Sequence, residues 1–454
     1  MFLHIVKKEI VNNILSFRFV ITCALLFALV LLAVLLMGNE YSVRQSEYAS
    51  IQKRERARIG QLQRIEEPHS LYRAVSEMSF SGLRRPKSAS ILARGLDDQV
   101  PIEVPAYGAI RSLSGAERMG RNALREIFQA PDFVYVVNVV ISLLALLFVF
   151  DSICGEKEQG TLKLLLAHSL PRDTVLLGKW IGGYISVALP FSLAVFAGFI
   201  YVYISGELVA DGLWRFVAIY GLSLVYISAF FTLGLMISTL AHRTSTALLV
   251  ALLVWICWIL VVPNIAPVVA RLAAPVPSRQ IIESEKAAID READLLLKGI
   301  QKRKVYGDEK EGERIRRAAK EKMRKLEQFY FERLQVQIEL TQNLARLSPS
   351  ASFLFAATRL AGTGPGLAQF FDQAMARYQR QHARFRRELY HATIGNDPQQ
   401  GDWLRTQDVP RFFIALEKLA DSLDAALFDV LLLLIFNALF FMLAHTFFLC
   451  YDVT

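Results

Sequence analysis

Charged side chains are scarce in this chain of 454 residues. Only 20% of its residues are Asp, Glu, Lys or Arg, whereas 54% are hydrophobic and the mean hydropathy is +0.34. A soluble protein of this size needs more charge on its surface. The composition therefore excludes a purely soluble enzyme, a disordered chain and a fibrous repeat, and it indicates an integral membrane protein with sizeable water-facing parts.

Cysteine is equally scarce. The four cysteines, at positions 23, 154, 257 and 450, all lie inside or beside apolar runs. This distribution offers neither a disulfide framework nor the spacing of a zinc site. No metal site is predicted.

The common catalytic motifs are absent as well. The chain has no His-Glu-x-x-His and no Gly-x-Ser-x-Gly, and its seven histidines are scattered. Gly155 and Gly160 have the four-residue gap of a phosphate-binding loop, but Thr161 and Leu162 stand where the phosphate-binding lysine belongs. We therefore predict no catalytic residue and no cofactor in this chain, and in particular no ATP hydrolysis by the chain alone.

Long apolar runs are what the chain has in abundance. Each is long enough to cross a hydrocarbon core as a helix. They predict six spans, at residues 19–37, 133–151, 174–205, 213–240, 245–268 and 425–450. The predicted fold class is an all-α membrane protein with about six transmembrane helices and a large extracytoplasmic helical domain.

The short loops predict the orientation, because Lys and Arg collect on the cytoplasmic side. The basic residues outside the spans include Lys7, Lys8, Arg18, Lys157, Lys163, Arg172 and Arg243, whereas loop 206–212 carries only acidic charges. Both termini are then cytoplasmic, and the polar segments 41–132 and 269–424 lie outside. Both segments are predicted to be helical.

Within the second polar segment, residues 298–325 hold twelve Lys or Arg against five Asp or Glu. Two interpretations stay open: a solvated helix surface, or a contact with anionic headgroups or an anionic substrate. Nucleic acid is not expected as a partner, because this segment lies on the wrong side of the membrane.

The cytoplasmic loop 152–173 contains a short amphipathic helix. Thr161 is suited to cap it, and Leu162, Leu165 and Leu166 share one face. The helix either docks into a groove of a soluble partner or lies flat on the membrane. A similar stripe in residues 1–18 favours a helix on the membrane surface.

Three polar side chains fall within the predicted spans: Asn138, Ser142 and Asn437. They are candidates for lining a substrate path. Groups of this kind more often bond one helix to another, and that interpretation is favoured.

The cytoplasmic loop carries a resemblance to a known family. Glu156, Gly160-Thr161-Leu162, Leu165-Leu166, Arg172 and Gly178-Lys179 resemble the E-x-x-x-GTL-x-x-LL…R…GK signature of ABC type-2 permeases. Many relatives have a proline three residues before the arginine, where this chain has Ser169. Further stretches resemble a branch with large external domains, annotated around multicopper-enzyme maturation: residues 86–95, 262–267, 347–349, 360–364 and 448–452.

The resemblance implies a function and partners. Members of the family are six-span subunits of ATP-driven exporters, and loop 152–173 would be the coupling helix that meets the ATPase subunit. The implied docking residues are Glu156, Gly160, Thr161, Leu162, Leu165, Leu166 and Arg172. The expected partners are that ATPase, which would carry ATP and magnesium, a second permease copy or a paralogue, and membrane lipid. The expected location is the bacterial inner membrane.

The resemblance implies one function, and the size of the external helices keeps a second one open. The first is a permease subunit that couples ATP hydrolysis to outward movement of a substrate. The alternative is a mechanotransmission subunit that drives an external or periplasmic partner without transport.

Overall fold

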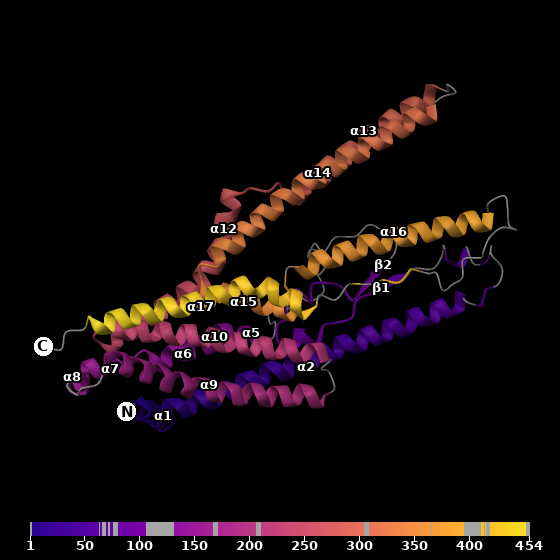
Figure 1. Ribbon diagram of the computed structural model, residues 1–454. Coiled ribbons are helices and arrows are strands. Elements are labelled where there is room, and N and C mark those ends of the chain that lie inside the picture. Colours follow the sequence, from indigo (N-terminus) through magenta and orange to yellow (C-terminus); the bar gives the residue numbers. More distant parts are fainter. Residues whose placement is uncertain are drawn as a thin grey trace. The chain divides into compact units, whose positions relative to one another are not determined.

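Helices make up almost all of the described structure. The computed structural model describes residues 2–62, 64–65, 70, 73–75, 80–105, 131–166, 171–205, 210–303, 308–364, 366–394, 410–412, 414 and 418–450. They form two compact units: the first comprises Met1–Leu253 and Ser352–Thr454, the second Val254–Ala351. Figure 1 shows the elements with the labels used below.

Six helices within the described residues are long and apolar enough to cross a membrane. Their bounds are Phe17–Leu62, Phe133–Glu158, Arg172–Ile204, Gly212–Leu240, Thr244–Ala273 and Leu419–Leu449. This confirms the predicted fold class, a helical protein with six candidate spans and further helices outside them. The chain is a multi-pass membrane protein.

The first candidate span belongs to a much longer helix. Helix α1 (Phe2–Ile14) is followed by α2 (Phe17–Leu62), a continuous helix of 46 residues. The helix passes the predicted end of the span at residue 37 because residues 39–62 are rich in Glu, Gln, Arg and Ala, which favour helix. At 1.5 Å per residue, α2 is roughly 70 Å long.

The remaining spans of the first unit include α10, against which several of them pack. In chain order they are α5 (Phe133–Tyr135), a π-helical turn (Val136–Ile141), α6 (Ser142–Val149), α9 (Arg172–Ile204), α10 (Ala210–Leu240), α11 (Thr244–Ile256) and α17 (Leu419–Leu449). Helix α10 lies against α17, α6 and α9, while α1 and α2 both lie along α9 (Figure 1).

Within the segment that follows α2, residues 80–105 form no α-helix. Strands β1 (Ser81–Leu83) and β2 (Glu103–Pro105) pair antiparallel, with Gly82 opposite Val104, and a 3-10 turn spans Ser88–Ile91. This differs from the helix predicted here. The reason is local, since glycines 82 and 95 and prolines 86, 101 and 105 interrupt any helical pattern.

The hairpin shares an apolar core with α16 (Gly366–Ile394) and the end of α2. Its buried residues are Leu62, Val75, Phe80, Val100, Val104, Leu367, Phe371, Met375, Tyr378 and Phe385. We call this assembly the outer core. Helix α2 thus connects a candidate membrane span directly to the outer core.

The second unit is built on a helical hairpin. After a π-helical turn (Cys257–Val261) come α12 (Val262–Ala273), α13 (Arg279–Arg303) and α14 (Asp308–Ala345), and α14 packs against both α12 and α13. Helix α15 (Pro349–Ala361) begins at the end of this unit. Ion pairs join the two arms, Lys322 with Glu292 (3.2 Å) and Lys286 with Glu327 (2.7 Å).

Candidate coupling site

Loop 152–173 contains two short helices rather than one. Helix α7 (Cys154–Glu158) and α8 (Thr161–Leu166) are separated by Gly160, whose φ is +74°. A residue with a side chain is strained in this left-handed conformation, so glycine sets the break. The Thr161 hydroxyl donates to the Glu156 carbonyl across the turn (3.4 Å).

Helix α7 is fastened to the end of α10 and the start of α11. The Ser238 hydroxyl accepts hydrogen bonds from the amides of Ile153 (3.0 Å) and Cys154 (3.1 Å). The Lys157 ammonium donates to the Thr239 carbonyl. The Glu158 carboxylate accepts from the Thr244 amide (2.9 Å) and hydroxyl (2.8 Å), at the first turn of α11 where a negative charge is favourable. These hydrogen bonds connect α7 to both α10 and α11.

A buried lysine joins α7 to two further helices. The Lys179 ammonium, on α9, lies 2.8 Å from Glu156 Oε1 on α7 and 3.0 Å from Glu9 Oε1 on α1. It also donates to the Ser152 carbonyl (3.2 Å). The lysine side chain is 4% exposed, whereas the Glu9 and Glu156 side chains are 18% and 24% exposed. We call Lys179, Glu9 and Glu156 the inner triad.

Two glycines allow α1 to reach this position. A Cβ atom placed on Gly178 would lie 2.7 Å from Ile5, and one on Gly182 would lie 2.7 Å from Glu9. Side chains at these positions would push α1 away from α9. The amphipathic helix predicted at residues 1–18 therefore packs on α9 with one face, while Leu3, Val11 and Ile14 on it remain exposed.

The start of α9 is bound to the end of α17. The Arg172 guanidinium donates to the Leu449 carbonyl (2.6 Å), and Asp173 lies 2.6 Å from His445 Nε2. Arg172 thus contacts α17. On the same unit, Arg18 of α2 pairs with Asp151 (2.5 Å), just before α7.

The predicted docking residues divide into two groups. In the first group, Glu156 belongs to the inner triad and Leu162 is fully buried, so both contact other residues of this chain. Gly160 and Thr161 are exposed, as is Lys163. The side chains of Leu165 and Leu166 lie outside the described residues. Contact of this element with an ATPase stays a prediction, and Gly160, Thr161 and Lys163 are exposed among its described residues.

The three polar residues inside the spans form hydrogen bonds between or within helices. The Tyr226 hydroxyl donates to Asn138 Oδ1 (2.7 Å), and the Ser142 hydroxyl donates to the Asn138 carbonyl (2.6 Å). The Asn437 amide donates to Ser228 Oγ (2.7 Å) and accepts from the Thr232 hydroxyl (2.9 Å). These contacts join α10 to the π-helical turn and to α17, which is the arrangement expected of helix-packing groups.

A second cluster of charges, outside the predicted site, lies between α2 and residues 80–105. Asp97 is fully buried and accepts from Arg84 (2.5 Å) and Arg44 (2.9 Å). Arg84 also donates to the carbonyls of Asp97 (2.7 Å) and Val100 (2.9 Å). We call Arg44, Arg84 and Asp97 the outer cluster. Sequence reasoning missed it because its members are far apart in the chain.

Backbone contacts join the outer cluster to the loop after α15. The Thr363 carbonyl accepts from the Leu96 amide (2.7 Å), the Thr363 hydroxyl donates to the Ala93 carbonyl (2.8 Å), and Lys87 donates to the Gly362 carbonyl (2.5 Å). Two stretches that carry the family resemblance, residues 86–95 and 360–364, therefore meet in space. Nothing in the one-dimensional pattern indicates that they pair.

Burial shifts the pKa values of titratable groups in and beside the outer core. Burial raises the pKa of the Asp132 carboxyl, although it accepts from the amides of Arg94 (2.9 Å) and Tyr135 (2.7 Å). Burial in the outer core lowers the pKa of His382 to about 4. His382 lies between the rings of Phe80 and Tyr378, with centroids 5.1 and 4.7 Å away. Within the part of the chain that the structure describes, no three His, Cys, Asp or Glu side chains are placed to hold a metal ion.

Comparison with known proteins identifies the family. The family described as "ABC-2 family transporter protein" matches residues 3–453. The chain is 34% identical over 132 residues to a probable ABC transporter permease protein NosY of Stutzerimonas stutzeri, and 34% identical over 130 residues to that of Pseudomonas aeruginosa. Each match covers 28% of this chain and 46% of the relative. The chain thus spans about half the length of the curated relatives it matches.

Proposed function

The chain belongs to the ABC-2 family of transporter proteins and is the permease subunit of an ABC transporter, and we propose that it couples ATP hydrolysis by a separate ATPase subunit to outward movement of a substrate. The family implies an ABC ATPase as partner. ATP and magnesium would belong to that ATPase, since this chain lacks the phosphate-binding lysine.

The observation that carries the proposal is the way α7 is anchored. This short element is bonded to α9 and α1 through the inner triad, and to α10 and α11 through Ser238, Thr239 and Thr244. An ATPase that moves α7 and α8 by closing on ATP would shift four helices together. Such a rigid-body change occurs if the nucleotide-bound ATPase binds one helix arrangement better than the other.

The proposal includes a topology with both termini and loop 152–173 in the cytoplasm. Single cysteines at Gly60 and Gly299 test it, because a Cβ at either position meets nothing within 4 Å. In a background with Cys450→Ser, both should react with an impermeant maleimide in intact cells, whereas Gln159→Cys should react only after permeabilisation. The reverse pattern would invert the topology and remove α8 from the side of the ATPase.

The proposed complex contains two permease chains, either two copies or a copy and a paralogue, above two ATPase subunits. A chain with six spans does not easily enclose a large pathway alone. Exposed apolar side chains along α17, such as Leu427, Phe428 and Ile435, fit a surface covered by lipid or a second permease. Cross-linking of α17 in membranes, followed by mass determination, would measure the number of permease chains.

Docking of the ATPase is tested at α8. Changing Leu165 and Leu166 together to Glu should abolish co-purification with the ATPase, because each buried leucine typically contributes about 1.5–3 kcal/mol and an unpaired buried charge adds a penalty. Lys163→Gln, an exposed change on the same helix, is the control and should leave the complex intact. A double-Glu variant that keeps its ATPase and its stimulated hydrolysis would contradict the docking role.

Two observations favour a second candidate function, mechanotransmission to an external partner. Asn138 and Asn437, candidates for lining a path, both bond to neighbouring helices. Helix α2 runs without a break from Phe17, at the start of the first candidate span, to Leu62 in the outer core, so motion at one end passes to the other.

Reconstituted vesicles separate the two functions. With the ATPase bound, ATP-dependent uptake or flipping of a candidate molecule supports transport. Stimulation of ATP hydrolysis by a soluble extracytoplasmic protein, without any uptake, supports mechanotransmission. The purified chain alone should show no hydrolysis in either case.

A further inference from the structure

Helix α16 has two different faces. Phe371, Met375, Tyr378, His382 and Phe385 recur at steps of three and four residues and are buried in the outer core. They occupy one side of the helix, since residues at this spacing share a face. Helix α16 is therefore held in place by its apolar side, and its other side is presented to solvent.

The solvent side carries a straight row of basic residues. Arg377, Arg380, Arg384, Arg387 and His391 are spaced by three and four residues and are all exposed. At 100° per residue they fall within an arc of roughly 80°, about opposite the buried face, and the row is roughly 21 Å long. We call these five residues the basic row.

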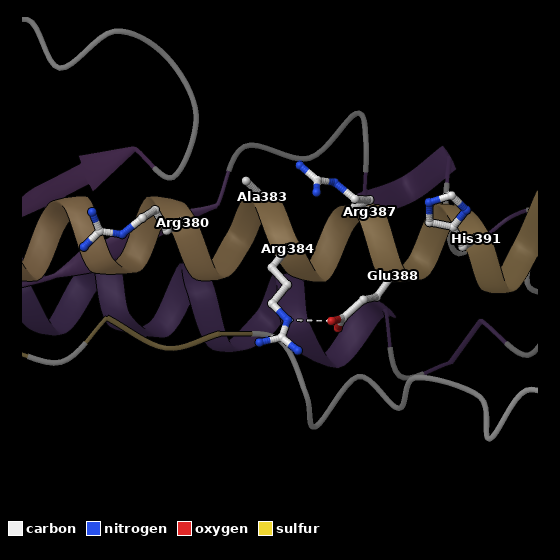
Figure 2. A pocket seen from close by; sticks show the side chains of 6 residues that line it. All are labelled: Arg380, Ala383, Arg384, Arg387, Glu388 and His391. Carbon is white, nitrogen blue, oxygen red and sulfur yellow. Dashed lines mark hydrogen bonds and ion pairs between the residues drawn. The ribbon is translucent and has the colours of Figure 1, made fainter. Parts of the chain in front are cut away.

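Figure 2 shows the pocket along this row, lined by Arg380, Ala383, Arg384, Arg387, Glu388 and His391. All six come from α16. Arg384 and Glu388 turn toward each other and form an ion pair (2.7 Å). Arg387 and Arg380 lie apart from this pair along the same helix (Figure 2).

In the part of the chain that the structure describes, ion pairs neutralise little of the basic row. Within the residues that the structure describes, Arg377, Arg380 and Arg387 form no ion pair. Basic residues on α14 are accompanied by almost as many acidic ones. There Arg317 pairs with Glu313 (2.6 Å) and Lys325 with Glu321 (3.1 Å), so α14 has the balanced surface of a solvated helix.

The geometry also discriminates between two kinds of anionic surface. A helix that binds anionic lipid inserts an apolar face between the headgroups, with basic residues beside it. The apolar face of α16 is already buried in the outer core. Arginine, by contrast, forms two parallel hydrogen bonds with a carboxylate. Arginines at helical spacing on one helix can therefore pair with carboxylates at the same spacing on another helix.

We propose that the basic row of α16 binds an acidic helical segment of another extracytoplasmic protein. The proposal rests on the proposed topology, which places α16 outside. It needs no ATPase, and it applies whether that protein delivers a substrate or receives mechanical work. The matching segment has Glu or Asp at positions i, i+3, i+7 and i+10 of a helix, so that the carboxylates face at least four of the five basic side chains.

The test uses the purified full chain in neutral detergent and a fluorescent peptide with four glutamates at that spacing in an alanine-rich helix. A control peptide has the same composition, with its glutamates distributed around the helix. Fluorescence anisotropy should show binding of the first peptide at least about tenfold tighter than the second, because only the first places every carboxylate on the row. Equal affinity for the two peptides would overturn the proposal.

Matched variants locate the binding surface. Arg380→Gln with Arg387→Gln removes two charges seven residues apart from α16, and Arg317→Gln with Arg324→Gln removes two at the same separation from α14. The four side chains are exposed, so the fold should persist, which circular dichroism checks. The α16 variant should bind the peptide about tenfold more weakly, and the α14 variant within about twofold of the original.

Equal losses in the two variants would mean general charge attraction and overturn the proposal. Vesicles of phosphatidylglycerol form a third arm. If the chain binds them and the α16 variant alone does not, the row is a lipid site and the proposal is wrong. The assay contains no ATPase, so a failure here is distinguishable from a failure of the Leu165 and Leu166 test.

Discussion

The inner triad and the outer cluster are both ion pairs that hold the first unit together, but they differ in what surrounds them. In the inner triad, a buried lysine pairs with two carboxylates that water can reach, and the three residues come from α1, α7 and α9. In the outer cluster, Asp97 is fully buried, and Arg84 also bonds to backbone carbonyls. Water therefore has better access to the carboxylates of the inner triad than to Asp97 of the outer cluster. We infer that the ion pairs of the inner triad can rearrange, whereas the outer cluster is a rigid contact, which we call the clamp.

The largest effect is expected from Gly95→Val, beside the outer cluster. Gly95 has a φ of +50°, and a Cβ there would overlap the Thr363 carbonyl oxygen and lie 2.7 Å from its hydroxyl oxygen. Backbone strain and this clash together should exceed about 3 kcal/mol, so little folded protein should survive. Size-exclusion chromatography after heating measures the loss. Gly60→Val, where a Cβ meets nothing, is the control, and equal damage there would refute the clamp.

Asp97→Asn should be nearly as damaging. It leaves Arg84 and Arg44 without their charged partner in a buried site, which typically costs about 3–5 kcal/mol. Thermal unfolding should report this loss. The exposed pair of Arg317 and Glu313 provides a comparison, since Glu313→Gln should cost less than about 0.5 kcal/mol. Similar values for the two variants would mean that burial does not distinguish the clamp from a surface pair.

The outer core should lose stability in acid through His382. Its pKa is lowered to about 4 in the folded state against about 6.5 when unfolded, so between these values the unfolded chain binds more protons. Stability should therefore fall as the pH drops from 6.5 to 4, by up to roughly 3 kcal/mol. Hydrogen exchange of α16 as a function of pH measures this. His382→Phe should remove that dependence, and an unchanged acid sensitivity would assign it to other groups.

Lys179→Gln should cost less stability than the changes above, roughly 2 kcal/mol, because water can solvate the partly exposed Glu9 and Glu156. Its main effect should be on coupling. The ATPase should still co-purify, but stimulation of its hydrolysis by the permease should fall by about tenfold, since α7 is no longer tied to α9. Lys163→Gln should leave stimulation unchanged. A Lys179 variant with normal coupling and lower stability would make the inner triad a structural contact only.

Several features of this protein could be predicted from the sequence. The six spans follow from uncharged runs that only a bilayer accommodates. The family signature in loop 152–173 predicted membership correctly. These predictions succeeded because each depends on residues that are neighbours in the chain.

Other features depended on residues that only folding brings together. The periodicity of α8 predicted a shared face for Leu162, Leu165 and Leu166, but Leu162 is buried within the chain. Glu156 matches the family signature, but its contact with Lys179 requires α7 to approach α9. Segment 41–132 was predicted to be helical, but within it residues 81–83 and 103–105 form paired strands, beside which Phe80, Val100 and Val104 share an apolar core with α16.

The sequence by itself determined where the chain can cross a membrane, because hydrophobicity acts on each segment alone and a run of about 20 apolar residues suffices. It also determined the spacing of the basic row on α16, since helical periodicity places those arginines on one face. The tertiary structure alone decided which charges are neutralised. Lys179 and Asp97 each form ion pairs, whereas Arg380 and Arg387 line a pocket. A Coulomb interaction depends on the distance between two side chains, and the order of residues in the chain does not contain that distance.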